Sequence, residues 1–292
     1  GPVDARAVVV ASGAQSVPRL PALAGALPPG VRSLHTADYR SPGELGPGAV
    51  LVVGAGQSGC QIAEDLLEAG RRVLLATSRV GRIPRRYRGR DILEWWRDCG
   101  FLDQRAGDVD ESARTATQPQ VSGTRGGHTV SLQQLARDGC TLLGRVAGVD
   151  GDRMALAEDL AENMAFADAA AARHRRLVDD YVARAGIDAP PPEDDPVDAP
   201  LDAPIAPTRE LDLRRTGVGT VIWSTGFGPD AAWLPPGALA PSGAPRGGGL
   251  EAAPGVYVVG APWLTRRASG ILAGFGGDAR AVADAIHRRL TA

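Results

Sequence analysis

The sequence predicts an α/β protein built on a parallel sheet, and three features indicate this fold. The first is an apolar, β-branched run at residues 49–53 that leads into a Gly-x-Gly-x-x-Gly turn at 54–59. The second is a helical pattern directly after this turn, followed by another apolar run at 72–77. The third is the return of the order strand, glycine-containing loop and helix at residues 255–279. Alternating strands and helices of this kind are typical of a parallel sheet.

Composition narrows the classes of protein to which the chain can belong. Its 292 residues, 43% of them apolar, suffice for one large domain or two of ordinary size. A net charge of −2 argues against nucleic acid or a membrane as a general partner, and no apolar run approaches the ~20 residues that span a bilayer. All 32 basic residues are arginine, which excludes a lysine Schiff base. Cys60, Cys99 and Cys140 are scattered, so we expect reduced thiols, a cytoplasmic protein and no metal site.

Periodicity and breaker residues give the expected elements. Ser131 is the expected N-cap of the helix that follows it, and Gly186 is the expected end of a long Ala-rich helical region. A Pro-rich, linker-like segment follows, to about residue 207. We expect strands at 7–11, 72–77, 141–146, 218–223 and 255–260, and helices at 57–69, 91–97, 132–137 and 156–185 and from about 277.

The glycine turn predicts a dinucleotide site. Gly54 permits the tight turn, Gly56 lets the backbone approach a pyrophosphate, and Gly59 lets helix and strand pack closely. The anion would lie at the helix N-terminus, beside Gln57 and Ser58, where free N–H groups and the helix dipole favour negative charge. The alternative is a tight turn without a ligand.

The end of the next strand favours NADP(H) over NAD(H). An NAD site usually has an Asp or Glu there that binds the ribose 2′-OH, but this chain has Thr77, Ser78 and Arg79, and more arginines follow. Guanidinium groups are planar, permanently charged donors that suit a 2′-phosphate. We select Arg79 first, with Ser78 as a hydroxyl donor and Arg86 as a further candidate. The alternative is an arginine-rich, solvated loop.

Several motifs together resemble the flavin-containing monooxygenase superfamily, and more closely its bacterial FAD- and NADPH-dependent oxidoreductases. The resemblance covers nearly the whole chain and depends on the combination, since no single piece is specific. The motifs lie at residues 11–15, 34–40, 53–59, 85–91, 222–227 and 255–263.

The resemblance implies a flavoprotein with two dinucleotide-binding domains, in which a Rossmann-like NADPH domain is inserted into an incomplete FAD domain. The implied FAD-binding parts are residues 1–47 and 229–292, and the NADPH-binding part is 48–228, with a helical and linker insertion at 158–207. The strand ends that carry Gly13 and Ala14, and Thr225 and Gly226, would mark the crossings between the domains. Residues near FAD would be Gly260, Gly277 and Asp278.

The sequence also departs from the family pattern. His35 and Tyr39 match the end of the family signature, but Pro29 and Val31 stand where its Phe and Gly would be. The FAD fingerprint normally lies a domain's length before the NADPH one, and no counterpart precedes residue 49. We therefore expect a C-terminal portion that requires an N-terminal FAD segment or a partner chain.

The resemblance implies an enzyme in which NADPH reduces FAD and the reduced flavin oxygenates a small organic substrate. Oxygenation of nitrogen or sulfur is favoured over Baeyer–Villiger insertion by Tyr39 and Arg40. The cofactor carries this chemistry, so no catalytic side chain is predicted. The alternative is a non-catalytic NADP-binding module, or half of a split flavoprotein.

Overall fold

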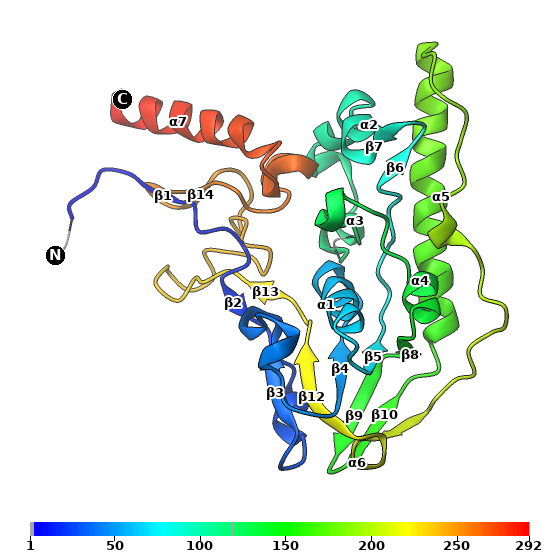
Figure 1. Cartoon of the computed structure of the whole chain (residues 1–292). Helices are drawn as coiled ribbons and strands as arrows, with labels where there is room; N and C mark the ends of the chain where they lie inside the picture. The colour runs from blue at the N-terminus through cyan, green and yellow to red at the C-terminus, as the bar shows by residue number, and fades with distance from the viewer. Residues whose placement is uncertain (1–2, 118, 292) are drawn as a thin grey trace. The chain divides into compact units, whose positions relative to one another are not determined.

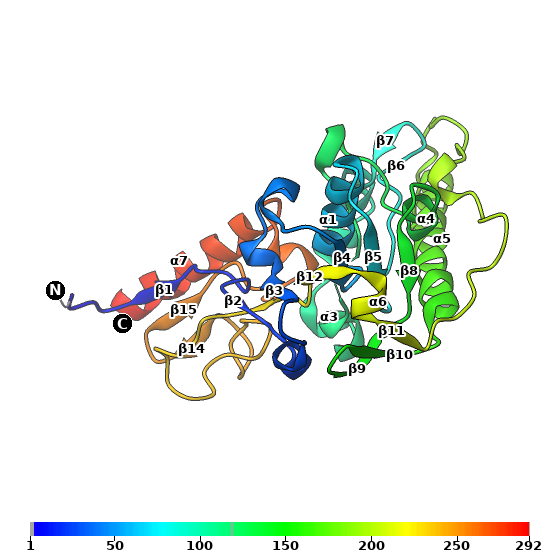
Figure 2. The ribbon, with the colours of Figure 1, turned by 60° about the horizontal axis from the view of Figure 1, so that its bottom comes forward.

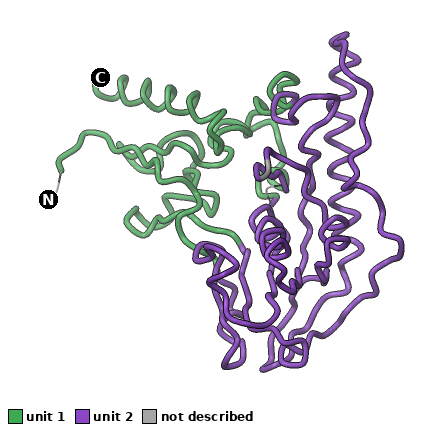
Figure 3. Tube along the Cα trace, in the orientation of Figure 1, with its two compact units in different colours: residues 1–19, 96–116, 226–292 green, residues 20–95, 117–225 purple. Residues whose placement is uncertain are grey.

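The structure is a computed structural model that describes residues 3–117 and 119–291 (Figure 1). The chain divides into two compact units, shown in Figure 3: unit 1 is residues 1–19, 96–116 and 226–292, and unit 2 is 20–95 and 117–225. These limits differ from the domain limits expected above, because residues 20–47 fall in unit 2 and residues 96–116 in unit 1. The assignment of domains to cofactors stays a prediction.

Unit 2 contains a five-stranded sheet in which each neighbouring pair of strands is parallel. The α/β fold expected from the sequence is thus present. The edge strand β3 is not among the strands expected from the sequence. In spatial order the strands are β3 (Arg32–His35), β12 (Val218–Trp223), β4 (Ala49–Val53), β5 (Val73–Ala76) and β8 (Thr141–Leu143).

One face of this sheet is covered by helices α1 (Gln57–Glu68) and α4 (Leu132–Arg137). Val50 and Val52 of β4 belong to the same buried cluster as Leu66 of α1. Side chains alternate between the faces of a strand, so Leu51 of β4 belongs to a second buried cluster on the other face of the sheet. The expected N-cap is confirmed, because Ser131 accepts a hydrogen bond from the N–H of Gln134 at 3.1 Å.

The other face is covered by a small antiparallel sheet, where a doubly wound fold would place helices (Figure 2). Two sequence expectations are corrected here: the strand expected at 141–146 ends at residue 143, and the helix expected from 156 begins at 160. Residues 146–156, between this strand and this helix, form a β-hairpin, and Gly151 in its turn has φ +57°. The strands, in spatial order, are β11 (Glu210–Asp212), β10 (Arg153–Leu156) and β9 (Val146–Asp150).

The long helix α5 (Leu160–Ala185) runs along one side of unit 2 (Figure 1). It is a single helix, and Gly186 ends it in the left-handed conformation at φ +63°, as expected. The Pro-rich segment after it is fastened to the rest of unit 2. Arg137 donates to the carbonyls of Pro196 and Ala199, and Ser131 donates to that of Val197. The remaining elements are β6 (Arg86–Tyr87), β7 (Arg90–Asp91), α2 (Ile92–Asp98) and α6 (Leu213–Thr216).

Unit 1 is built around a three-stranded sheet in the order β1-β15-β14. Strands β1 and β15 are parallel, with Val10 opposite Val258, and β14 is antiparallel to β15. The buried core beside this sheet is small, consisting of Val10, Val258, Ala261 and Leu264. The elements of this unit are β1 (Val8–Val10), β2 (Val17–Pro18), α3 (Glu111–Thr115), β13 (Phe227–Gly228), β14 (Glu251–Ala253), β15 (Val256–Val258) and α7 (Phe275–Thr291).

Within residues 3–117 and 119–291, no helix is long and apolar enough to cross a membrane.

Candidate functional site

The glycine turn joins the end of β4 to the start of α1. Gly54 has φ +108°, a conformation that residues with a Cβ rarely adopt, and its N–H donates to the carbonyl of Ala76 at 2.9 Å. A Cβ at Gly54 would collide with the backbone carbonyl of Ser224, and one at Gly59 would collide with the carbonyl of Gly54. Both positions therefore require glycine for the fold of the turn itself.

Gly56 differs from its two neighbours in the motif. It has ordinary extended dihedrals, φ −71° and ψ −178°, and a Cβ built there would meet no atom within 4 Å. The fold alone does not require glycine at this position, whereas the close approach of a ligand to the backbone would. No side chain caps the N-terminus of α1, and Gln57 and Ser58 are exposed there. The turn thus fits the pyrophosphate of a dinucleotide.

The end of β5 lies beside this turn, since Val53 and Ala76 are opposite each other in neighbouring parallel strands. Thr77 is buried, and its hydroxyl donates to the carbonyl of Leu143 at 2.8 Å. Ser78 is half-buried and Arg79 is exposed, with its guanidinium 4.8 Å from the ring centre of Phe166 in α5. An exposed cation therefore follows the strand next to the glycine turn.

The six arginines between residues 79 and 90 fall into two groups. Four are bound to carboxylates: Arg82 to Asp168 and Asp198, Arg85 to Asp91, Arg88 to Asp179 and Arg90 to Glu94. The other two, Arg79 and Arg86, pair with no carboxylate of the described residues. Arg86 donates to the carbonyl of Gly126 at 2.9 Å, and nothing places it beside the glycine turn.

Strand β12 ends at the same edge of the sheet. Trp223 is opposite Val53, and the N–H of Ser224 donates to the carbonyl of Val53 at 2.8 Å, so Thr225 follows directly at the turn. The structure thus brings together most of the residues expected to hold a dinucleotide in unit 2: Gly54, Gly56, Gln57, Ser58, Gly59, Ser78, Arg79 and Thr225.

The residues expected near FAD lie in unit 1, as do those expected at the crossings between the domains, except Thr225. Gly13 and Gly260 follow the adjacent parallel strands β1 and β15, both with positive φ and with no atom within 4 Å of an added Cβ. The carboxyl edge of a parallel sheet is where α/β proteins bind ligands. Gly226 also has positive φ and open space, and the methyl of Ala14 lies close to Gly243.

Gly277 and Asp278 lie in the first turn of α7, and unlike Gly13 and Gly260 they are surrounded by other groups of unit 1. A Cβ at Gly277 would collide with the guanidinium of Arg266, so packing within unit 1 explains this glycine. Asp278 is 1% exposed; its Oδ1 accepts a hydrogen bond from the hydroxyl of Thr265, and its Oδ2 has no partner among the described residues. An orphaned buried oxygen is compatible with a site that receives a further donor.

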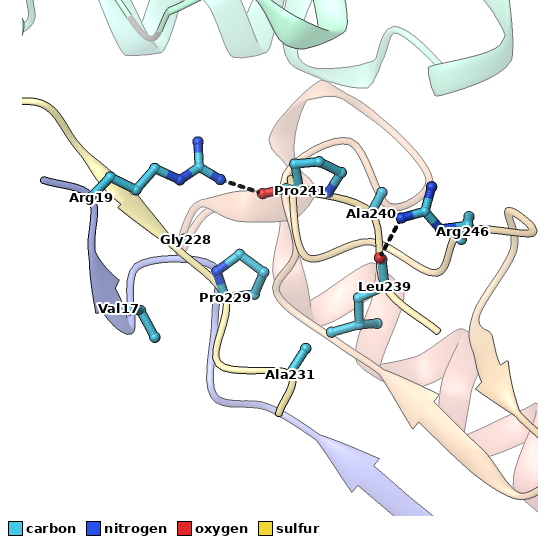
Figure 4. A pocket seen from close by; sticks show the side chains of 9 residues that line it. All are labelled: Val17, Arg19, Gly228, Pro229, Ala231, Leu239, Ala240, Pro241 and Arg246. Atoms are coloured by element: carbon cyan, nitrogen blue, oxygen red, sulfur yellow. Dashed lines mark hydrogen bonds between the residues drawn. The ribbon is translucent and has the colours of Figure 1, made fainter. Parts of the chain in front are cut away.

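Unit 1 also has a cavity of about 360 Å³ (Figure 4). Its wall is mostly apolar, with side chains such as Val17, Pro229 and Leu239. The two arginines that line it serve the neighbouring loop: Arg19 donates to the carbonyl of Pro241 at 2.9 Å, and Arg246 donates to that of Gly237 at 3.0 Å. Their contacts support the loop and indicate no particular ligand.

Comparison with known proteins agrees with this geometry. The sequence model of the L-lysine 6-monooxygenase/L-ornithine 5-monooxygenase family matches residues 2–85. An uncharacterized oxidoreductase, CzcO-like, of Geobacillus kaustophilus is 27% identical over 278 residues. These two matches support the resemblance to the flavin monooxygenase superfamily. A flavin-containing monooxygenase from Stenotrophomonas maltophilia, at 17% identity, matches 98% of the chain with a TM-score of 0.53 and so shows the fold.

The chain spans less than two thirds of the length of these relatives. The match to the Geobacillus protein covers 94% of the chain and 63% of that protein, and the Stenotrophomonas structure is likewise covered to 63%. An uncharacterized oxidoreductase CzcO of Bacillus subtilis is 32% identical over 95 residues, which are 28% of its length.

Three residues beside the candidate nucleotide site are not among those expected from the sequence. Gln120 is buried, its amide donates to the carbonyl of Ala55 in the turn, and its Oε1 has no partner among the described residues. Asn163 donates to the hydroxyl of Thr77 at 3.2 Å, and Phe166 lies against Arg79. All three come from segments distant in sequence, so no local pattern signals them.

Proposed function

We propose that the chain binds NADP(H) at the glycine turn and acts as part of an NADPH- and FAD-dependent monooxygenase. The observation that carries this proposal is the contrast within the motif. Gly54 and Gly59 are required by the fold, whereas Gly56 faces open space at the uncapped N-terminus of α1. A glycine without a structural reason, at this position, is accounted for by a pyrophosphate that approaches the backbone.

The residues at the ends of β4 and β5 would bind different phosphate groups of the dinucleotide. The first N–H groups of α1 would hold the pyrophosphate, since a helix N-terminus is an anion site. Arg79 and Ser78 would hold the 2′-phosphate, because no carboxylate at the end of β5 is available for a free ribose hydroxyl. The same arrangement disfavours NAD(H).

FAD would be bound by a second dinucleotide-binding domain, to which Gly13 and Gly260 would contribute at the edge formed by β1 and β15. When bound and reduced by NADPH, FAD supplies the activation of O2 by which one oxygen atom is transferred to a small organic substrate. Oxygenation of nitrogen or sulfur, favoured over Baeyer–Villiger insertion, is part of the proposal. The chain's own residues would orient the two cofactors and exclude water.

Calorimetric titration of the 292-residue chain with NADP+ and with NAD+ tests the nucleotide site. We expect tighter binding of NADP+, and we expect Gly56→Ala to weaken it by about tenfold or more, since the new methyl would occupy the space left for the ligand. The fold should tolerate this alanine, whose dihedrals are allowed. Gly43→Ala, also in open space and without positive φ, is the matched control. Equal NADP+ binding by both variants would refute the site.

Titration with FAD, followed by absorbance and flavin fluorescence, tests the second cofactor. A bound flavin that NADPH reduces would support the monooxygenase proposal. A chain that binds NADP+ and takes up no flavin would instead support the alternative of a separate NADP-binding module or half of a split flavoprotein.

A further inference from the structure

Helix α5 contacts the segment after β5 at several positions. Its Asn163 donates to Thr77, its Phe166 ring lies against the guanidinium of Arg79, and its Asp168 pairs with Arg82 at 2.6 Å. A Cβ at Gly81 would be 3.1 Å from the Cβ of Ala170, so helix and segment also pack closely there. These contacts show that α5 packs along residues 77–82.

The contact between Phe166 and Arg79 lies in the middle of this series and differs from the others. Asn163 and Ala170 are buried, and Arg82 is 2% exposed, so these contacts belong to the interior. Arg79 is exposed, and Phe166 is only half-buried. Phe166 and Tyr181 are the only Phe, Tyr or Trp residues of α5, and three of the six buried residues of this helix are alanine. The interior of unit 2 therefore gives no reason for an aromatic ring at this position.

We propose that Phe166 is a positioning residue that determines the preference of the site for NADP(H), by holding Arg79 ready for the 2′-phosphate. This inference rests on the nucleotide site proposed above. The guanidinium lies over the ring, 4.8 Å from its centre. A cation over an aromatic face is attracted to it, and a guanidinium that is stacked by its face keeps its N–H donors, which lie in its plane, for a phosphate.

The physical effect is preorganisation. A free arginine side chain has many rotamers, and ordering it opposes binding. The Phe166 ring limits these rotamers before the ligand arrives, and the pairs on either side, Asn163–Thr77 and Asp168–Arg82, keep the ring in place. Phe166 would therefore affect only ligands that carry the 2′-phosphate.

The test is the ratio of the dissociation constants for NAD+ and NADP+, measured by calorimetry on the 292-residue chain and its variants. Arg79→Ala should lower this ratio by about tenfold or more, as loss of a charged phosphate contact would. Phe166→Leu should lower it by about two- to fivefold, with NAD+ binding unchanged. Phe166→Tyr should restore the preference. Leu177→Ala, a half-buried apolar position of α5 farther along the helix, is the control and should leave the ratio as it is.

The outcomes separate this inference from the proposed function. A wild-type chain without preference for NADP+ refutes both. If Arg79→Ala lowers the ratio and Phe166→Leu does not, the NADP(H) site stands and the role of Phe166 is wrong. If Phe166→Leu weakens both nucleotides equally, the ring supports the fold alone and the inference is likewise wrong. A preference that persists in Arg79→Ala also overturns it, because the phosphate is then held elsewhere.

Discussion

The two units of the chain differ in how fully their apolar residues are buried. In unit 2 the five-stranded sheet is covered on both faces, and Val50, Leu51 and Val52 of its central strand are each 0% exposed. In unit 1 the buried cluster beside the sheet has four members among the described residues, and the strand β1 leaves Val8 and Val9 at 42% and 44% exposed. Other apolar side chains of unit 1 are more exposed still, including Trp233 at 56% and Leu272 at 89%.

This difference indicates that unit 2 contributes more than unit 1 to the stability of the chain. Burial of apolar surface is the main favourable term in folding, so unit 2 gains most of it. The nucleotide site proposed here lies wholly within unit 2 and does not depend on the order of unit 1.

The largest expected effect comes from a matched pair of valines. Val52 and Val9 are both central in a parallel strand, but only Val52 is fully buried. We expect Val52→Ala to lower the free energy of unfolding by about 3 kcal/mol, through lost burial and a cavity, and Val9→Ala by less than about 1 kcal/mol. Urea denaturation, with hydrogen exchange followed separately in β4 and β1, measures both. Equal costs would break the comparison.

The sequence predicts unit 2 best where the determinants are local. The strand, glycine turn and helix at residues 49–68, the cap by Ser131 and the end of α5 at Gly186 all follow from spacing over a few residues. The hairpin of β9 and β10 was missed, although Gly151 beside Asp150 is a turn signal, because the apolar run before it was read as a single strand.

The candidate site was predictable only in part for a related reason. Glycine spacing and the missing carboxylate indicate where the nucleotide would lie. Which arginine remains without a carboxylate depends on partners far along the chain, such as Asp168 for Arg82 and Asp179 for Arg88. Contacts between residues about 90 apart leave no local pattern, so the sequence could select Arg79 by its place after the strand but could not show that four of the later arginines are paired.

An intermediate effect is expected from an ion pair of each unit. Arg82 in unit 2 is 2% exposed and binds Asp168 and Asp198, while Arg266 in unit 1 binds Asp103 at 2.8 Å with both side chains more exposed. We expect Arg82→Ala to lower the free energy of unfolding by about 2 kcal/mol, because charges of a partly buried cluster lose their partner. Arg266→Ala should cost about 1 kcal/mol or less, since exposed pairs contribute little. The same denaturation measurements apply, and a reversed order would contradict the ranking.

The smallest expected effect concerns a polar contact that fastens the connection between β3 and β4 to helix α1. The hydroxyl of Tyr39 donates to Asp65 at 2.5 Å, and burial, followed by this hydrogen bond and the charge of Asp65, raises the pKa of Tyr39 well above its usual value. Tyr39→Phe should lower the free energy of unfolding by about 1 kcal/mol near neutral pH. A raised pKa means that the wild type loses stability as the pH rises above about 10, where the unfolded tyrosine ionises first. The gap between wild type and variant, measured by urea denaturation at pH 7, 9 and 11, should therefore stay constant to pH 9 and narrow by pH 11. A gap that is absent at pH 7 would show that this contact adds nothing to unit 2, and a gap that widens at pH 11 would contradict the raised pKa of Tyr39.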